Sequence, residues 1–477
     1  MKIDLKPTKF KFDKKLLFYF ISMFLIFFIM NSCRWTYHNF HRINFDEIGI
    51  VLNSGLTGTD SGLLWSFIRK AVFNSLKWTV VISIFLNFFR NHKKIIFLVY
   101  AVCLVFLCQK VKNSNIQFGS FFNFNHSTFY ESEYIDPKNT NIKWDKKRNV
   151  LFIALESIEK VYGSTDVFNE VLTPNITNIE KQNISFENYH SLSGLSHTIA
   201  AITGFTTGLP LFYTSYSQIE KMVGASGIGS IFKDAGYETW SIFPATGKFS
   251  LKGNFMHRMG FDNVIDGEDI RKSMPTPPTE APFYGVDDGT LFDWSKETIK
   301  NIVKSKKPYF LFMETINTHC KGYFTEYCKN IGFKQKRTED IIKCDDKIIS
   351  DFVKWFQKTD PSAVIILIND HPQHSGVIMK KLNLVKNRNL ANVFINTNVF
   401  KGADLNRPVS AMDFFPTIVE SAGAKIDGCK LGLGVSLTKR CQNVQTLRER
   451  YNDQELENLM EQKNNLYYKL STGKEKK

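Results

Sequence analysis

Side chains that can bind a metal ion follow three of the most apolar runs in the sequence. In chain order they are Glu156, His319, and Asp370 with His371, which follow the runs 150–155, 310–318 and 365–369. In an open sheet of parallel strands, the carboxyl ends of neighbouring strands meet in one crevice. Two carboxylates and an imidazole suit a divalent cation. We therefore predict that these residues converge on a metal ion, whereas each taken singly would be interpreted as a surface acid or a helix cap.

A hydroxyl-rich turn lies between the first and second of these runs. Residues 191–197 are rich in serine, and Thr198 opens a helix-like apolar segment. Backbone N–H groups at a helix N-terminus favour an anion. A hydroxyl becomes an effective nucleophile once a metal ion or a base lowers its pKa. Thr198 is therefore a candidate nucleophile, and the alternative is that Ser196 or Thr198 caps the helix.

The elements that would position these residues alternate between two kinds. Strand-like apolar runs occupy residues 149–155, 239–243, 309–313, 363–368 and 392–395. Amphipathic, helix-like segments between them include residues 227–235, 290–303 and 341–356. This alternation predicts one α/β domain on a largely parallel sheet, over residues 146–442. Residues 113–145 are polar and rich in asparagine, which predicts a linker, and 443–477 are predicted to form a polar helical tail.

The first 112 residues have the composition of a membrane anchor with about three transmembrane helices. The apolar spans are 16–33, 71–89 and 95–108, of which the last two are short for a bilayer core of about 30 Å. Residues 1–115 hold 16 Lys and Arg against 5 Asp and Glu, so most of the net charge of +15 flanks these spans. Such charges are orientation signals and not a nucleic-acid-binding surface. With residues 1–15 and 90–94 in the cytoplasm, three spans would place the rest of the chain outside the membrane.

Five of the eight cysteines lie beyond the apolar region. They contain no CxxC pair, so a zinc-ribbon or thioredoxin-like site has no support. In an oxidising compartment we expect one disulfide between Cys429 and Cys441 and a second between Cys328 and Cys344, with Cys320 as a competing partner. The alternative is five unrelated thiols.

Seven short motifs occur in the order found in the alkaline phosphatase–sulfatase superfamily. They are residues 149–157, 172–175, 186–188, 198–200, 315–319, 370–371 and 413–417. The chain is most similar to the membrane-bound branch, which contains phosphoglycerol transferases of periplasmic glucans, lipoteichoic acid synthases and phosphoethanolamine transferases. Residues 227–237, 252–254 and 257–262 resemble the phosphoglycerol transferases most. The resemblance covers about residues 148–420 and implies an alkaline-phosphatase-like α/β/α sandwich.

Carried over by position, the resemblance implies a metal site. Its ligands would be Glu156, Asp370, His371 and the oxygen of Thr198, with Thr198 as the nucleophile. The further Asp and His ligands of a two-metal site cannot be placed in this sequence, so one ion is expected. Carboxylate, hydroxyl and imidazole ligands suit Zn²⁺, Mn²⁺ or Mg²⁺.

The resemblance also implies residues that bind the substrate. His319 matches a histidine that contacts the transferred phosphate and could protonate the departing oxygen, and Lys252 lies where relatives place a basic phosphate contact. His374, three residues after His371, either faces the cleft or lies in solvent. The Cys/Ser-x-Pro-x-Arg motif of true sulfatases is absent, which argues against sulfate-ester hydrolysis.

The resemblance implies a transferase in the cytoplasmic (inner) membrane, with its catalytic domain facing the periplasm or exterior. It would move a phosphate-linked head group, with phosphoglycerol favoured, from phosphatidylglycerol or phosphatidylethanolamine to a glycan through a phospho-threonine intermediate. One alternative is a phosphoethanolamine transferase acting on lipopolysaccharide or another glycan. Another is a sulfatase-like phosphodiesterase or phosphatase that passes the intermediate to water. A membrane-anchored glycan-binding protein is the non-enzymatic alternative.

Overall fold

The chain forms two compact units, which are described separately. The computed structural model describes residues 7–40, 43–44, 65–112, 116–117, 127–212, 224–278, 282–319, 322–374 and 376–474. The smaller unit comprises Met1–Phe45 and Thr59–Phe118, and the larger one Asp46–Gly58 and Gly119–Lys477.

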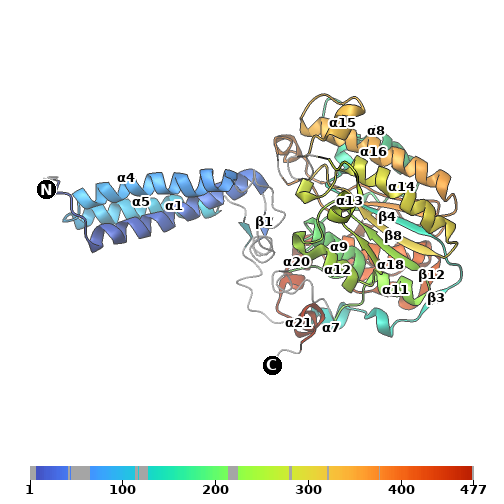
Figure 1. The fold of residues 1–477 in the computed structure, drawn as a ribbon. Helices are drawn as coiled ribbons and strands as arrows, with labels where there is room; N and C mark the ends of the chain where they lie inside the picture. Colours follow the sequence, from blue (N-terminus) through green and yellow to red (C-terminus); the bar gives the residue numbers. More distant parts are fainter. Residues whose placement is uncertain are drawn as a thin grey trace. The chain divides into compact units, whose positions relative to one another are not determined.

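The smaller unit is a bundle of long apolar helices: α1 (Lys14–Phe40), α4 (Asn74–Phe88), which the short π-helical segment η1 (Ile68–Phe73) precedes, and α5 (Lys93–Lys112) (Figure 1). Three spans are long and apolar enough to cross a membrane, at Lys14–Tyr37, Trp65–Phe88 and Lys93–Lys112. The expected apolar helices are therefore confirmed. The second begins earlier than expected because η1 continues it towards the N-terminus.

One helix of this bundle buries polar side chains beside apolar ones and exposes large apolar residues. On α4, the buried residues include the polar Ser75, Thr79, Ser83 and Asn87, whereas Trp78 is half exposed. The Asn31 amide donates to the Ser75 hydroxyl at 3.0 Å. Because lipid is as apolar as a leucine side chain, helices in a bilayer associate through such polar contacts and expose their apolar residues. This arrangement fits a membrane and not water.

A six-stranded sheet forms the centre of the larger unit, in the order β10-β9-β4-β8-β6-β7. The strands are β4 (Val150–Leu155), β6 (Glu238–Ile242), β7 (Asn263–Ile265), β8 (Tyr309–Glu314), β9 (Val364–Asn369) and β10 (Asn392–Ile395). Neighbouring strands are parallel except β10, which runs antiparallel to β9. The largely parallel sheet and its five expected strands are confirmed. Strand β7 was not predicted, because its three half-buried residues are too few to show a period.

Helices cover both faces of this sheet. Strands β4, β8 and β9 are buried along their whole length, as strands of a parallel sheet with two covered faces are. One face packs against α9 (Thr198–Thr207), α11 (Ile228–Asp234) and α18 (Ala411–Ser421). The other packs against α8 (Pro174–Gln182), α14 (Asp288–Lys304) and α16 (Thr338–Thr359) (Figure 1). The fold is the expected α/β/α sandwich.

Elements at both ends of the larger unit pack onto this body. Helix α7 (Phe129–Glu133) and strand β3 (Ile142–Trp144) precede the sheet, and β3 pairs with β12 (Ala424–Ile426). The last helices are α19 (Leu447–Arg450), α20 (Asp453–Glu461) and α21 (Asn465–Thr472). Leu447, Leu456 and Met460 are buried in the same core as α9, and the Tyr130 hydroxyl donates to the Met460 carbonyl at 2.9 Å.

Two disulfides close short loops in the larger unit. Cys328 of α15 (Glu326–Asn330) is bonded to Cys344 of α16, with a Cα–Cα distance of 5.8 Å. Cys429 is bonded to Cys441, with a Cα–Cα distance of 5.6 Å. Cys320, the competing partner considered above, lies outside the described residues.

The disulfides lead to a stability prediction. Opening the 16-residue loop by substituting both Cys328→Ser and Cys344→Ser should lower the free energy of unfolding by about 2–4 kcal/mol, because the unfolded chain gains freedom. Urea unfolding of the full chain measures this difference. Peptide mapping without reductant should recover both linked pairs, and free thiols at these four positions would contradict the assignment.

Candidate active site

The register of the central strands brings the predicted metal ligands to one edge of the sheet. Strand β4 lies between β8 and β9, with Leu155 opposite Asn369 and Ala154 opposite Glu314. Glu156 and Asp370 are the residues that follow these strand ends. Both therefore emerge side by side at the carboxyl edge, where open α/β sheets bind ligands.

Glu156, Asp370 and His371 form a buried cluster. One ligand atom of each lies within 4.8 Å of the others. The Nε2 atom of His371 is 3.3 Å from Glu156 Oε1 and 3.4 Å from Asp370 Oδ2. The structure thus brings together the three charged or imidazole ligands that the sequence suggested.

Thr198 completes the cluster at the first turn of α9. Its Oγ1 atom is 3.2 Å from Glu156 Oε2, to which it donates, and 3.2 Å from His371 Nε2. The N-cap residue of α9 is His197, whose side chain makes no capping hydrogen bond. The Thr198 hydroxyl therefore faces the acids and the imidazole, and the interpretation of Thr198 as the cap is wrong.

Ser157 orients both carboxylates. Its hydroxyl donates to Glu156 Oε1 at 2.7 Å, and its backbone N–H donates to Asp370 Oδ1 at 3.0 Å. The backbone N–H of His371 also donates to Asp370 Oδ1, at 2.6 Å. Ser157 adopts a left-handed φ of 53° to make these contacts. Such strain in a residue other than glycine is typical of functional sites.

The cluster is short of positive charge. Burial, reinforced by the nearby Glu156 carboxylate, raises the pKa of Asp370 to about 6. Burial likewise raises the pKa of Glu156. Asp370 Oδ2 accepts no hydrogen bond from any residue that the structure describes. A divalent cation would offset the negative charge and occupy this oxygen, so the donor set fits a metal ion.

Lys252 and Glu314 form a buried ion pair beside the cluster. Lys252 begins α12 (Lys252–Arg258), and its Nζ lies 2.5 Å from Glu314 Oε1, with both side chains at most 4 % exposed. The ammonium also lies 5.1 Å from the centroid of the Phe243 ring. Burial is the main cause of a raised pKa at Glu314, and the Asp370 carboxylate adds to it. Lys252 is thus held near the cluster by Glu314, which was not predicted as a site residue, because it lies inside the run 310–318 and only His319, after that run, was expected to reach the site.

The two other histidines that were predicted as site residues, His374 and His319, occupy different surroundings. The His374 ring stacks on that of His371, with centroids 4.8 Å apart, and its Nε2 lies 2.6 Å from the Ser196 carbonyl. Burial lowers the pKa of His374 well below its usual value. His374 therefore packs against the site and does not extend into solvent. His319 lies in the loop after β8. Its ring makes a T-shaped contact with the Phe283 ring, and the two ring centroids are 4.8 Å apart.

Hydrogen bonds tie this His319 loop to the rest of the site. The Thr318 hydroxyl donates to the Glu156 carbonyl at 2.5 Å, and the Gln373 amide donates to the Thr318 carbonyl at 3.0 Å. The Arg388 guanidinium, paired with buried Glu159, donates to the Gln373 carbonyl at 2.6 Å. Glu159, Gln373 and Arg388 were not predicted from the sequence, because their contacts join segments far apart in the chain.

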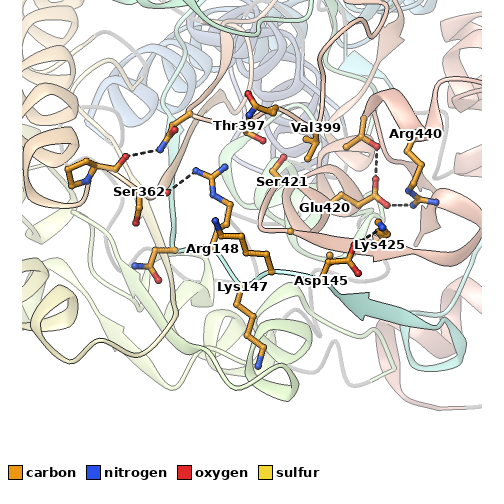
Figure 2. Close-up of a pocket in the computed structure, with 18 residues that line it drawn as sticks. Asp145, Lys147, Arg148, Ser362, Thr397, Val399, Glu420, Ser421, Lys425 and Arg440 are labelled. Atoms are coloured by element: carbon orange, nitrogen blue, oxygen red, sulfur yellow. Dashed lines mark hydrogen bonds and ion pairs between the residues drawn. The ribbon is translucent and has the colours of Figure 1, made fainter.

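A cavity of about 700 Å³ lies at the opposite end of the strands (Figure 2). Its lining includes Arg148 and Asn149, which precede β4, and Ser362, which precedes β9. Arg148 donates to the Ser362 carbonyl at 2.8 Å, and Lys425 pairs with Asp145 at 2.5 Å. The cavity contains none of the clustered ligands, so it is separate from the candidate active site.

Comparison with known proteins identifies the family. The sequence model of the sulfatase family matches residues 148–424, which is more than half of the chain. The chain therefore belongs to the sulfatase family. The matched segment contains the complete cluster of Glu156, Thr198, Asp370 and His371.

Individual relatives are more distant. Phosphoglycerol transferase I of Escherichia fergusonii is 27 % identical over 260 residues, which cover 51 % of this chain and 33 % of the relative. The match thus spans about a third of that protein's length. A protein of the alkaline phosphatase superfamily from Vibrio parahaemolyticus has a TM-score of 0.51 at 21 % identity, covering 64 % of this chain and 75 % of its own. The lipooligosaccharide phosphoethanolamine transferase A of Neisseria meningitidis has a TM-score of 0.50 at 12 % identity, covering 85 % and 84 %. These two structures share the fold.

The cluster predicts an unusual pH dependence of stability. Because folding raises the pKa of Asp370 from 3.8 to about 6, the metal-free folded state binds a proton more tightly than the unfolded state does. Its free energy of unfolding should therefore fall by about 3 kcal/mol as the pH rises from about 4 to above 6.

Chemical unfolding of the unsubstituted protein and of Asp370→Asn, both in the presence of a chelator, isolates the contribution of Asp370 to this pH dependence. Zn²⁺, Mn²⁺ or Mg²⁺ added at neutral pH should restore the stability of the unsubstituted protein. The same pH profile in both proteins, with no response to any of the three ions, would contradict the metal site.

The buried ion pair predicts a non-additive pair of substitutions. Lys252→Met leaves the Glu314 carboxylate buried without its partner and should lower the free energy of unfolding by about 3–5 kcal/mol. Adding Glu314→Gln should recover most of this loss, because the uncompensated charge is gone. Urea unfolding at neutral pH measures both changes, and additive losses would show that the two groups do not interact.

Proposed function

We propose that this protein is a metal-dependent transferase that moves a phosphate-linked head group, phosphoglycerol first, from a membrane phospholipid to a glycan hydroxyl. The observation that carries the proposal is the position of the Thr198 hydroxyl, 3.2 Å from both Glu156 and His371 in a buried, metal-fitting cluster. The curated relatives support the choice of head group, since they bear the name phosphoglycerol transferase I. Sulfate-ester hydrolysis is not proposed, because Thr198 and the residues after it lack the Cys/Ser-x-Pro-x-Arg motif.

In this mechanism Glu156, Thr198, Asp370 and His371 would hold one divalent ion, Zn²⁺, Mn²⁺ or Mg²⁺. When bound, the ion supplies positive charge that lowers the pKa of the Thr198 hydroxyl and offsets charge on the phosphate. The Thr198 oxygen attacks phosphorus while its proton passes to Glu156, towards which it already points. The bond from phosphorus to the diacylglycerol oxygen breaks, and His319 protonates that oxygen. A phospho-threonine carrying the head group remains.

The second half of the reaction reverses these roles. A glycan hydroxyl attacks the phosphorus of the phospho-threonine and His319 takes its proton. The bond from phosphorus to the Thr198 oxygen breaks, and Glu156 returns its proton to that oxygen. Lys252 binds phosphate oxygens in both halves, because Glu314 occupies one side of its ammonium and leaves further N–H donors. His374 keeps the nucleophile in place through the Ser196 carbonyl, two residues before Thr198.

The three apolar helices support a location in the cytoplasmic membrane. With the basic segments 1–15 and 90–94 in the cytoplasm, the larger unit would lie outside, in the periplasm or at the cell surface. An exterior location is consistent with two disulfides in that unit. Membrane anchoring lets the acyl chains of the donor stay in the bilayer during transfer.

Substitution of the nucleophile tests the proposal directly. Thr198→Ala should reduce transfer to the uncatalysed level while the melting temperature changes little, because its hydroxyl does not cap α9. Thr198→Ser is the matched control and should keep measurable activity. The assay incubates the full chain with labelled phosphatidylglycerol or phosphatidylethanolamine, with and without glycan.

The fate of the label separates the alternatives. Glycan-bound label supports the transferase, whereas free head group regardless of glycan identifies a hydrolase. The mass added to the Thr198 peptide should name the head group. Undiminished transfer by Thr198→Ala would end the proposal, and turnover of neither lipid would leave the glycan-binding alternative.

A further inference from the structure

A surface loop leaves the candidate active site at His374 and returns to it at Arg388. The His374 ring stacks on His371 at one end of the loop. At the other end, Arg388 donates to the Gln373 carbonyl at 2.6 Å and to Glu159 Oε2 at 2.7 Å. Both ends are therefore fixed beside the cluster. A compact excursion of this kind, with its ends close together, is a frequent location of function.

The loop packs one set of apolar side chains inward and leaves another in solvent. It contains α17 (Met379–Leu382), and its buried residues are Ile378, Met379 and Leu382. Val377 is 77 % exposed and Leu384 is 82 % exposed. The core therefore accounts for the first set and not for these two.

The same kind of exposure occurs on a second segment of the site. Tyr284 is 65 % exposed. The ring of its neighbour Phe283 contacts the His319 ring, with the two centroids 4.8 Å apart. Phe283 and Tyr284 both adopt left-handed φ values, of 46° and 58°. Consecutive strained residues persist where function requires them.

Exposed apolar side chains are thus concentrated at the site. Among the described residues of the larger unit, Leu384, Val377 and Tyr284 are the three most exposed large apolar side chains, and the next, Ile135, is only 38 % exposed. Isolated exposed apolar residues need no explanation, but a group on segments that flank a catalytic cluster indicates a binding surface.

Charge identifies the partner. Residues 376–388 contain four basic residues and no acid. Arg388 is paired with Glu159, and Lys381 lies 3.4 Å from Glu339. Lys380 and Lys386 are exposed. Exposed apolar side chains beside lysines are the pattern of segments that lie in the interface of an anionic membrane.

We propose that Tyr284, Val377, Leu384, Lys380 and Lys386 form a lipid-facing rim that docks the candidate site onto the bilayer surface. The three apolar side chains enter the boundary between head groups and acyl chains, and the two lysines contact anionic head groups. Docking brings the phosphate of a donor lipid to Thr198 while its acyl chains stay in the membrane. The identity of the donor rests on the function proposed above, whereas contact between the rim and lipid does not.

Photo-crosslinking tests this contact without requiring activity. The full chain carrying Leu384→p-benzoylphenylalanine is placed in phosphatidylglycerol-containing vesicles and irradiated. Lipid adducts at position 384 are expected, with none for the control Lys425→p-benzoylphenylalanine, an exposed position at the opposite end of the strands. Absence of lipid adducts at 384, equal adducts at both positions, or adducts at 384 only to a second copy of the chain would overturn the proposal.

Kinetics with two donors provide the second test. The double substitution Val377→Ser with Leu384→Ser should raise the apparent KM for long-chain phosphatidylglycerol in vesicles by about tenfold, since less apolar surface enters the membrane. Turnover of a short-chain, water-soluble phosphatidylglycerol should not change. Ile135→Ser is the matched control and should alter neither. Equal losses of turnover with both donors would show damage to the site and overturn the proposal. Inactivity of the unsubstituted protein would reject the proposed function, and the crosslinking result would then decide whether the rim contacts lipid.

Discussion

Two buried carboxylates at the ends of adjacent strands impose the main constraint on this structure. Glu156 and Asp370 lie close together and away from water, and burial raises the pKa of both, so ionising them without a compensating positive charge lowers stability. Burial of an uncompensated charge is strongly unfavourable. A bound cation would therefore stabilise this arrangement when both acids are ionised. The Ser157 contacts and the turn that carries Thr198 hold the oxygen atoms of Glu156, Asp370 and Thr198 together at this point.

The sheet makes this arrangement possible. Because β4 is parallel to both β8 and β9, the residues after each of these strands reach one edge, and each strand delivers a different group. Glu156 follows β4, and Asp370 and His371 follow β9. Strand β8 ends at Glu314, which is the ion-pair partner of Lys252. The helices on both faces bury the strands and keep these distances fixed. The same edge holds the site and the exposed apolar residues around it, which links the chemistry to the surface where a lipid would arrive.

Much of the fold was accessible from the sequence because its signals are local. Continuous apolar runs predicted β4, β8 and β9, and long apolar spans between basic residues predicted the anchor helices. Strand β7 was missed because three half-buried residues show no period.

For the site, the sequence predicted the types of the ligands and the strand ends that carry them, but not the contacts among them. Whether Thr198 caps α9 or faces Glu156 depends on the residue at which the helix begins, which the spacing does not fix to one residue. Glu314 was not predicted because only His319 was expected to reach the site from the run 310–318. The exposure of Val377 and Leu384 could not be foreseen, because apolar residues in a sequence are ordinarily assigned to a core.

The proposed chemistry requires one divalent cation to bind between Glu156, Thr198, Asp370 and His371. Anomalous X-ray diffraction from crystals of the protein soaked with Mn²⁺ or Zn²⁺ tests it most directly. A single strong peak is expected within about 2.0–2.3 Å of the Thr198 oxygen, one oxygen of each acid and Nε2 of His371. A peak elsewhere, or a metal-loaded protein in which the Thr198 hydroxyl points away from the ion, would contradict it.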